Sequence, residues 1–172
     1  MRAEEEQRGL SSATDSPGPG PLRFGVTAAG LVFTHERAVA EDAPRTLDLL
    51  RELRGRGRLV VRLNRLYWSG GDATIDALRA GSSRYGNEGF DVSLQLRYGG
   101  PHDHLPEGGP DAFAAWVRRV VQSIAQEDRV IAVEITNEPN LEIAPDNSDG
   151  AFERVSEALV AATIAASEEA RT

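Results

Sequence analysis

Two kinds of hydrophobic pattern alternate along the chain. Short runs of β-branched and other apolar residues are typical of strands, and segments whose apolar residues lie three or four positions apart are typical of helices. The predicted strands lie at residues 23–27, 59–66, 90–98 and 130–136. A helical segment follows each strand, after a loop in the first case. Strand-helix units at intervals of roughly 30 to 40 residues predict an α/β fold with parallel neighbouring strands.

The clearest helix follows Pro110. Its apolar residues lie three or four positions apart and include Trp116, which we expect in the core against the sheet. The first helix begins at Pro44 and ends near Gly55, and a short second helix at residues 72–80 ends before Gly81, because glycine is favoured just past a helix C-terminus. The last helix follows Asp149-Gly150 and carries Phe152, Val155, Leu159 and Ile164.

The first residues differ in composition from the rest. Residues 1–21 have few large apolar side chains and end in alternating prolines and glycines, so we expect a disordered leader or linker. Residues 22–172 are expected to form one domain, because 172 residues with 40% hydrophobic content suit a single compact core. The loop at residues 28–33 lacks the G-x-G-x-x-G spacing of dinucleotide sites, and no G-x-x-x-x-G-K-S/T occurs. Rossmann-type and P-loop nucleotide binding are therefore not expected.

The charge balance argues against nucleic acid as a partner. The chain has 19 basic and 27 acidic residues, and the formal net charge of −8 repels phosphate backbones. It has no cysteine, which excludes disulfides and thiolate metal sites. No apolar run of about 18 residues predicts a membrane span, so no membrane partner is expected. The acidic N-terminus lacks the basic and apolar segments of a secretory signal, so the chain as written is expected to be cytoplasmic.

The segment with the most specific chemistry ends the fourth predicted strand. There the sequence reads Glu134-Ile135-Thr136-Asn137-Glu138-Pro139-Asn140. An Asn-Glu-Pro tripeptide at the carboxyl end of a strand resembles the acid/base signature of clan A glycoside hydrolases. Those enzymes are (β/α)8 TIM barrels with this motif on the fourth strand, so the resemblance implies that residues 22–172 are the first four units of such a barrel. It also implies that Glu138 is the proton donor and that Asn137 holds the 2-hydroxyl of the sugar.

The position of the motif suits this chemistry, because barrel active sites form at the carboxyl ends of the strands. Alternation along the strand is expected to place Glu138, Thr136 and Glu134 on one side. A carboxylic acid donates a proton to the departing glycosidic oxygen near neutral pH only where burial or a second carboxylate raises its pKa. The alternative is a plain turn that ends a strand, with Glu138 solvated.

Further residues are candidates for contact with the sugar. Arg62 in the second strand resembles the arginine that clan A enzymes place beside their nucleophile, and Glu134 is expected to be its buried partner. Arg97 ends the third strand where many relatives carry a histidine, so a substrate contact by Arg97 would depart from the family pattern. Tyr67 and Trp68 either stack on sugar rings or pack in the core.

The resemblance also implies what these units lack. The nucleophile of retaining clan A enzymes is a glutamate at the end of the seventh strand, and the two carboxyl groups lie about 5 to 5.5 Å apart. We therefore expect a truncated retaining O-glycosidase, inactive alone, that acts on a carbohydrate and needs no cofactor. Two alternatives stay open: a half-barrel without catalysis that pairs with a partner or a second copy, and a protein that binds sugar without hydrolysis. Because relatives are often secreted, the localisation is unknown.

Two loops contain residue types that bind metals, but neither predicts a metal site. His102-Asp103-His104 follows the third strand, and a catalytic zinc would need a third protein ligand, which stands at no diagnostic spacing. A solvated loop is the favoured interpretation. Residues 146–150 resemble a calcium loop but lack its ligand alternation and the glutamate at its twelfth position. Ser148 or Asp149 as the N-cap of the last helix explains this segment better.

Overall fold

The computed structural model describes residues 23–28, 31–34, 37–40, 42–100, 105–145 and 147–171. Two segments with predicted properties, the leader at residues 1–21 and the loop His102-Asp103-His104, lie outside these residues. So does Asp146, the first residue of the segment that resembles a calcium loop. Their predicted character therefore stays a prediction.

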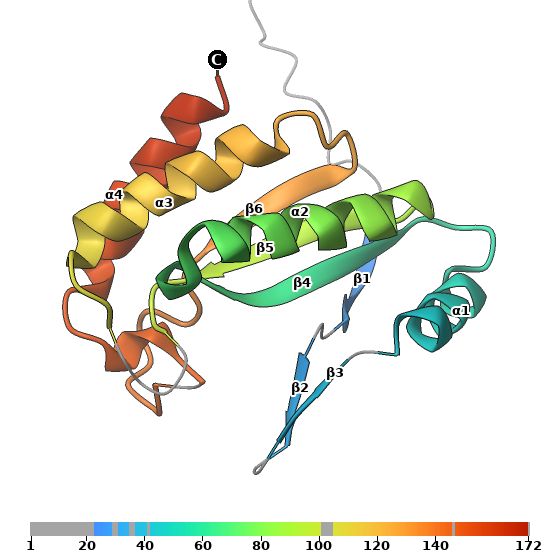
Figure 1. The fold of residues 1–172 in the computed structure, drawn as a ribbon, viewed down its shortest axis with the longest axis horizontal. Coiled ribbons are helices and arrows are strands. Elements are labelled where there is room, and N and C mark those ends of the chain that lie inside the picture. Colours follow the sequence, from blue (N-terminus) through green and yellow to red (C-terminus); the bar gives the residue numbers. More distant parts are fainter. Residues whose placement is uncertain are drawn as a thin grey trace, which may run out of the picture.

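A parallel sheet, whose strands are connected by helices along the chain, forms the centre of the structure (Figure 1). Its strands are β1 (Phe24–Ala28), β4 (Leu59–Tyr67), β5 (Asp91–Arg97) and β6 (Val130–Ile135). They lie in the order β1-β4-β5-β6 and all pair in parallel. The helices are α1 (Ala43–Arg54), α2 (Gly71–Asn87), α3 (Gly109–Ile124) and α4 (Val155–Glu169). The predicted α/β class and parallel pairing are confirmed.

An antiparallel hairpin interrupts the first strand-helix unit, where we expected only a loop. Its strands β2 (Leu31–Thr34) and β3 (Arg37–Ala40) pair with each other and form a separate sheet. In Figure 1 the hairpin extends away from the main sheet. The expectation was wrong because it overlooked a short apolar run, Leu31-Val32-Phe33-Thr34, which has the composition of a strand.

The second helix is longer than predicted. The predicted end at Gly81 is wrong, because α2 continues to Asn87 and buries Tyr85 in its last turns. A Cβ atom at position 81 would lie 3.1 Å from Cδ1 of Leu63 on β4. Gly81 therefore permits close packing of the helix on the sheet, at a helix-propensity cost of about 1 kcal/mol relative to alanine.

One hydrophobic core fills the space between the sheet and the helices. The apolar residues of β4 and β5 pack there with α3, and Trp116 is 1% exposed, as predicted. Of the apolar residues expected on the last helix, Phe152 and Val155 are buried, whereas Ile164 is 54% exposed. The buried face of α4 consists of Val155, Ala158, Ala162 and Ala165. Its small side chains permit close packing on α3, which α4 contacts extensively (Figure 1).

A buried carboxylate joins the amino-terminal ends of the strands. The side chain of Asp91 is 2% exposed and accepts hydrogen bonds from Nε and Nη2 of Arg58 at 3.0 and 2.8 Å. Arg129 lies 3.5 Å and Arg23 3.9 Å from the same carboxylate. The hydrogen bonds from Arg58 hold the pKa of the Asp91 carboxyl below its ordinary value, and the charge of Arg23 acts in the same direction. Segments that begin all four strands of the sheet thus share one carboxylate.

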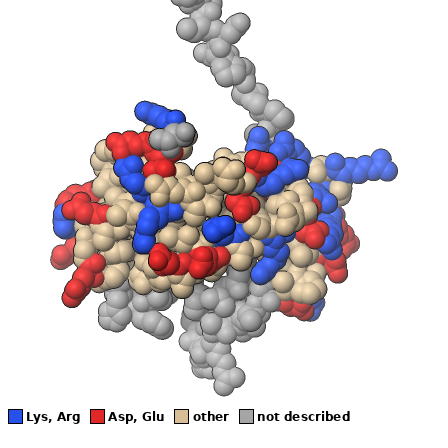
Figure 2. Space-filling view, turned by 45° about the horizontal axis from the view of Figure 1, so that its top comes forward, with Lys and Arg blue, Asp and Glu red and all other residues tan. Residues whose placement is uncertain are grey.

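The surface shows no large region of a single charge on the face drawn in Figure 2, where acidic and basic side chains are interspersed. The net charge of −8 is therefore not concentrated in one patch on this face. Among the described residues, no helix has both the length and the apolar composition needed to cross a bilayer.

Candidate functional site

The Asn137-Glu138 segment lies just after β6, which ends at Ile135. Thr136 continues the pairing for one more residue, since its N–H donates to the carbonyl of Leu96 at 2.8 Å. Thr136 and Glu138 then adopt left-handed φ angles of 68° and 48°. A β-branched residue is an outlier in this region, and such conformations cost about 1–3 kcal/mol each and persist only where the surrounding structure holds them.

This turn corrects one expectation from the sequence. The strand alternation that was to place Glu138 on the same side as Glu134 ends at Ile135, so it does not extend to Glu138. The direction of the Glu138 side chain is set instead by the turn and by the loop that packs against it. Strained backbone of this kind is concentrated at binding and catalytic sites, which makes the turn a candidate site independently of its sequence motif.

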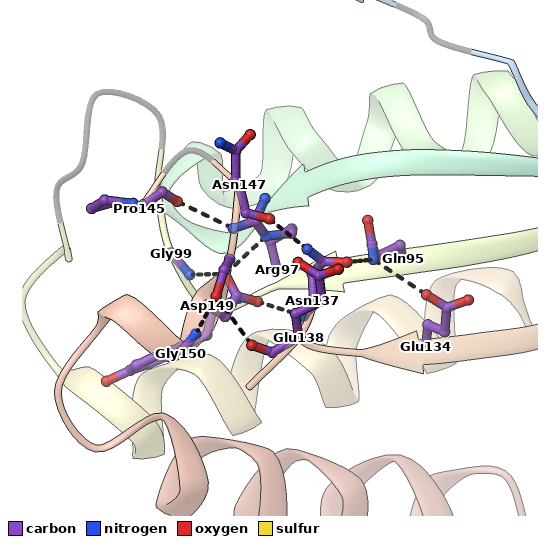
Figure 3. A network of polar contacts seen from close by, with 12 residues as sticks. Gln95, Arg97, Gly99, Glu134, Asn137, Glu138, Pro145, Asn147, Asp149 and Gly150 are labelled. Atoms are coloured by element: carbon purple, nitrogen blue, oxygen red, sulfur yellow. Dashed lines mark hydrogen bonds and ion pairs between the residues drawn. The ribbon is translucent and has the colours of Figure 1, made fainter. Parts of the chain in front are cut away.

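Asp149, in the short helix η3 (Asp149–Ala151), forms hydrogen bonds with the turn (Figure 3). Asp149 is 0% exposed. Its Oδ2 accepts hydrogen bonds from the N–H groups of Asn137 at 2.8 Å and Tyr98 at 3.1 Å. Its Oδ1 accepts from Nε of Arg97 at 2.8 Å and from the N–H of Gly99 at 3.3 Å. One carboxylate therefore joins the carboxyl ends of β5 and β6.

Ser148 contributes a second set of contacts to the turn. Its Oγ accepts the N–H of Gly150 at 3.2 Å, which makes Ser148 the N-cap of η3 rather than of the following helix α4. The same hydroxyl lies 3.1 Å from the carbonyl of Glu138 and also contacts the carbonyl of Leu141. The Ser148-Asp149 segment thus touches both residues of the Asn137-Glu138 turn. These contacts with the turn give a role to Ser148 and Asp149, two residues of the segment that resembled a calcium loop.

The side-chain amide of Asn137 is held at both ends. Its Oδ1 accepts a hydrogen bond from Nε2 of Gln95 at 2.8 Å, and its Nδ2 donates to the carbonyl of Asn147 at 2.6 Å. A primary amide has two N–H donors and two lone pairs. Within the described part of the chain, one donor and one acceptor of Asn137 are therefore left for a ligand, and a hydroxyl group can satisfy both.

Glu138, the predicted proton donor, is exposed. Its backbone is fixed by the contacts described above, whereas no contact of its carboxylate with another described side chain is seen. The burial that a general acid requires would therefore have to come with a bound substrate. The site presents a fixed amide beside an exposed carboxylate.

Arg62 and Glu134 form the predicted ion pair. Nε of Arg62 lies 3.1 Å from Oε1 of Glu134, and a second contact joins Nη2 to Oε2. The prediction that Glu134 would be buried is wrong, because the two side chains are 29% and 47% exposed. Gln95 also donates to Glu134 at 3.2 Å and to Asn137, as Figure 3 shows. Together with the ion pair, these contacts form a continuous line from Arg62 through Glu134 and Gln95 to Asn137.

A hollow of about 300 Å³ lies on the same face of the sheet, between β1 and β4. It is lined by Arg23, Gly25, Val26, Thr27, Val60, Arg62 and Ser93. Arg62 therefore belongs both to the hollow and to the line of contacts that ends at Asn137. A ligand in the hollow would reach the guanidinium group of Arg62.

The remaining predicted contacts lie deeper in the structure. Arg97 is 1% exposed, donates to the carbonyl of Pro145 at 3.2 Å and lies 5.9 Å from the ring centroid of Tyr67. Trp68 is 7% exposed, stacks on Tyr98 and donates to its carbonyl, which corresponds to the packing alternative. Burial raises the pKa of the Tyr98 phenol. Tyr67 is half-buried, and contact of Arg97 or Tyr67 with substrate stays a prediction.

Sequence reasoning missed Gln95 and the central role of Asp149. The signal that could have found Gln95 is its position between Leu94 and Leu96 in the middle of a predicted strand, because a buried amide needs partners. For Asp149 the sequence offered a competing role as a helix cap. Among the described residues, no group of three or more His, Asp or Glu side chains could hold a metal ion.

No protein-family model matches this chain, and no curated protein matches it. The resemblance to clan A glycoside hydrolases therefore stays a prediction, which rests on the Asn-Glu-Pro tripeptide and its position after the fourth strand of the sheet. Conclusions about function depend on the contacts of the turn itself.

Proposed function

We propose that this chain carries the acid/base half of a retaining O-glycosidase site. In this proposal Glu138 donates the proton to the departing glycosidic oxygen, and Asn137 holds the 2-hydroxyl of the sugar. The observation that supports it best is the Asn137-Glu138 turn, in which left-handed backbone on both sides of Asn137 is held by a buried carboxylate. A fixed amide with one free donor and one free acceptor suits a sugar hydroxyl.

The location of the turn gives further support. The turn follows the last strand of a parallel sheet at its carboxyl end, where the active sites of βα-repeat proteins are assembled. In the sheet, each strand pairs with the strand of the next strand-helix unit along the chain, an order compatible with the first half of a (β/α)8 barrel. In the proposed arrangement, Arg62 and Glu134 line the inner face of this half-barrel.

The proposed mechanism needs a second carboxyl group about 5 to 5.5 Å from Glu138. We propose that further βα units supply this nucleophile, because the two other carboxylates described at the turn and beside it are already paired, Glu134 with Arg62 and Asp149 with Arg97. The four described units would then bind a glycoside without hydrolysing it. Binding, rather than turnover, is therefore the property to measure on this chain.

The test is a calorimetric titration with a panel of p-nitrophenyl β-glycosides that differ in the sugar. At least one is expected to bind saturably to the wild-type chain. Asn137→Ala is expected to weaken that binding about tenfold or more, because a hydrogen-bonded hydroxyl loses its partner. The matched control is Asn87→Ala, which removes an exposed asparagine from the end of α2 and should change nothing.

Glu138→Gln keeps the size of the side chain, and the exposed Glu142→Gln in the same loop is its control. Both variants are expected to keep the binding of the p-nitrophenyl glycosides within a few-fold. A panel in which no glycoside binds would remove the proposal. Equal weakening by Asn137→Ala and Asn87→Ala would remove the assigned site.

A second candidate is a half-barrel that pairs with another copy. The observation that favours it is Phe24 on the edge strand β1, which is 73% exposed. Open edges of this kind invite pairing with another strand. Sedimentation equilibrium would show a dimer that Phe24→Glu dissociates, whereas a monomer at every concentration would exclude this candidate.

A further inference from the structure

We infer that Asp149 is a positioning residue, which holds the Asn137-Glu138 turn in its ligand-binding shape before any ligand arrives. The inference rests on the proposed function only for what the turn binds. That Asp149 holds the turn follows from its contacts with Asn137 and Arg97, whatever ligand the turn binds.

The contacts between Asp149 and Asn137 run in both directions. The carboxylate accepts the N–H of Asn137 at 2.8 Å, and the N–H of Asp149 donates to the carbonyl of Asn137, also at 2.8 Å. Both backbone polar groups of Asn137 are therefore satisfied by one residue. Because Thr136 and Glu138 on either side have left-handed φ angles, the turn needs such external support to persist.

Arg97 makes a buried carboxylate at this position tolerable. The side chains of Arg97 and Asp149 are 2% and 0% exposed, so Arg97 places an opposite charge beside a carboxylate that water does not reach. Arg97 also donates to the carbonyl of Pro145 at 3.2 Å, which ties the loop before Asp149 to the end of β5. The pair therefore fixes Asp149 relative to the sheet, and Asp149 in turn fixes the turn.

The other end of the sheet provides a matched control. Asp91 is also a buried carboxylate paired with an arginine, and its side chain is 2% exposed. Its described partners are the side chains of Arg58, Arg129 and Arg23, and none of them belongs to the turn. A variant at Asp91 loses a comparable structural interaction while the Asn137-Glu138 turn keeps all of its contacts.

The first measurement is amide hydrogen exchange in Asp149→Asn and Asp91→Asn, at a temperature where both variants are folded by circular dichroism. The amide of Asn137 is expected to exchange about tenfold to a hundredfold faster in Asp149→Asn, because it loses a charged acceptor. The amide of Leu94 in the central strand should exchange as in the wild type. In Asp91→Asn the Asn137 amide should be unchanged. Unchanged exchange at Asn137 in Asp149→Asn, or equal acceleration in both variants, would overturn the inference.

The second measurement is the affinity for the p-nitrophenyl β-glycoside that binds best in the panel. Asp149→Asn is expected to weaken binding about as much as Asn137→Ala, and the double variant no further, because both act on one contact. Asp91→Asn should keep wild-type affinity, and wild-type affinity in Asp149→Asn would overturn the inference. If no glycoside binds any form, the proposed function fails, and the exchange measurement alone decides whether Asp149 holds the turn. If Asp149→Asn does not fold, Asp149→Glu replaces it in both measurements with the same expected outcomes.

Discussion

Arg62 on β4 and Glu134 on β6 form an ion pair across the face of β5, with Nε of the arginine 3.1 Å from Oε1 of the glutamate. The two residues are 72 positions apart in the sequence. Ser93 of β5 pairs in register with Arg62, and both residues line the hollow. The pair links alternate strands on the face that carries the candidate site.

Glu134→Gln is expected to destabilise the fold by about 1 kcal/mol or less, because exposed ion pairs contribute little. The side chains of this pair are 29% and 47% exposed, which sets that low expectation. Urea unfolding of the variant, compared with the exposed control Glu153→Gln, measures the difference. A loss several times larger would mean that the pair holds β4 and β6 together, which an ion pair this exposed is not expected to do.

Asp91→Asn is expected to lower the free energy of unfolding by about 2 kcal/mol at pH 7, because the hydrogen bonds from Arg58 lose their charged acceptor. The folded-state pKa of Asp91 is below its unfolded value, because Arg58 donates to the carboxylate. The stabilisation is therefore complete above the ordinary aspartate pKa of about 3.9 and is lost as the pH falls through the lower, folded-state pKa.

The corresponding measurement is urea unfolding of wild type and Asp91→Asn between acid and neutral pH. The difference between the two proteins should shrink as the pH falls below about 4. The exposed Asp76→Asn, as a control, should follow the wild type throughout. A difference that is independent of pH would contradict the role assigned to the charge of Asp91.

Gly150→Ala is expected to destabilise the loop that holds the candidate site. A Cβ atom at position 150 would lie 2.3 Å from the carbonyl oxygen of Leu141 and 2.7 Å from its carbonyl carbon. Because these are backbone atoms, the loop must shift, at a cost of about 1–3 kcal/mol. Gly57→Ala is the control, since its nearest contact would be at 3.5 Å. A melting temperature equal to that of the control would show that the contact with Leu141 is not required.

The strands of the main sheet were predictable because each is a short apolar run, and the parallel order followed from the spacing of the units. Two errors in the helices have one origin. Gly81 lies where a side chain of β4 packs closely on α2, and the alanines of α4 form its buried face, so glycine and alanine there serve packing. In a sequence pattern, glycine predicts the end of a helix, and alanine does not indicate which face is buried. Packing against a neighbouring element gives both residues a different role.

The candidate site was predictable where a local motif, or the expected face of a strand, pointed to it. Asn137 and Glu138 were found from a tripeptide, and the pairing of Arg62 with Glu134 from their expected face of the sheet. The role of Asp149 depends on a loop that returns to the end of β5, and no local pattern encodes that return. The left-handed φ angle of Thr136 was equally hidden, because β-branched residues ordinarily avoid it.

The most direct test of the central claim compares the best-binding p-nitrophenyl β-glycoside with its 2-deoxy analogue, in the wild type and in Asn137→Ala. If Asn137 holds the sugar's 2-hydroxyl, loss of that hydroxyl should weaken binding to the wild type about tenfold or more and should leave binding to Asn137→Ala unchanged. Equal weakening in the two proteins, or no effect in either, would contradict the assignment of this turn as a glycoside-binding site.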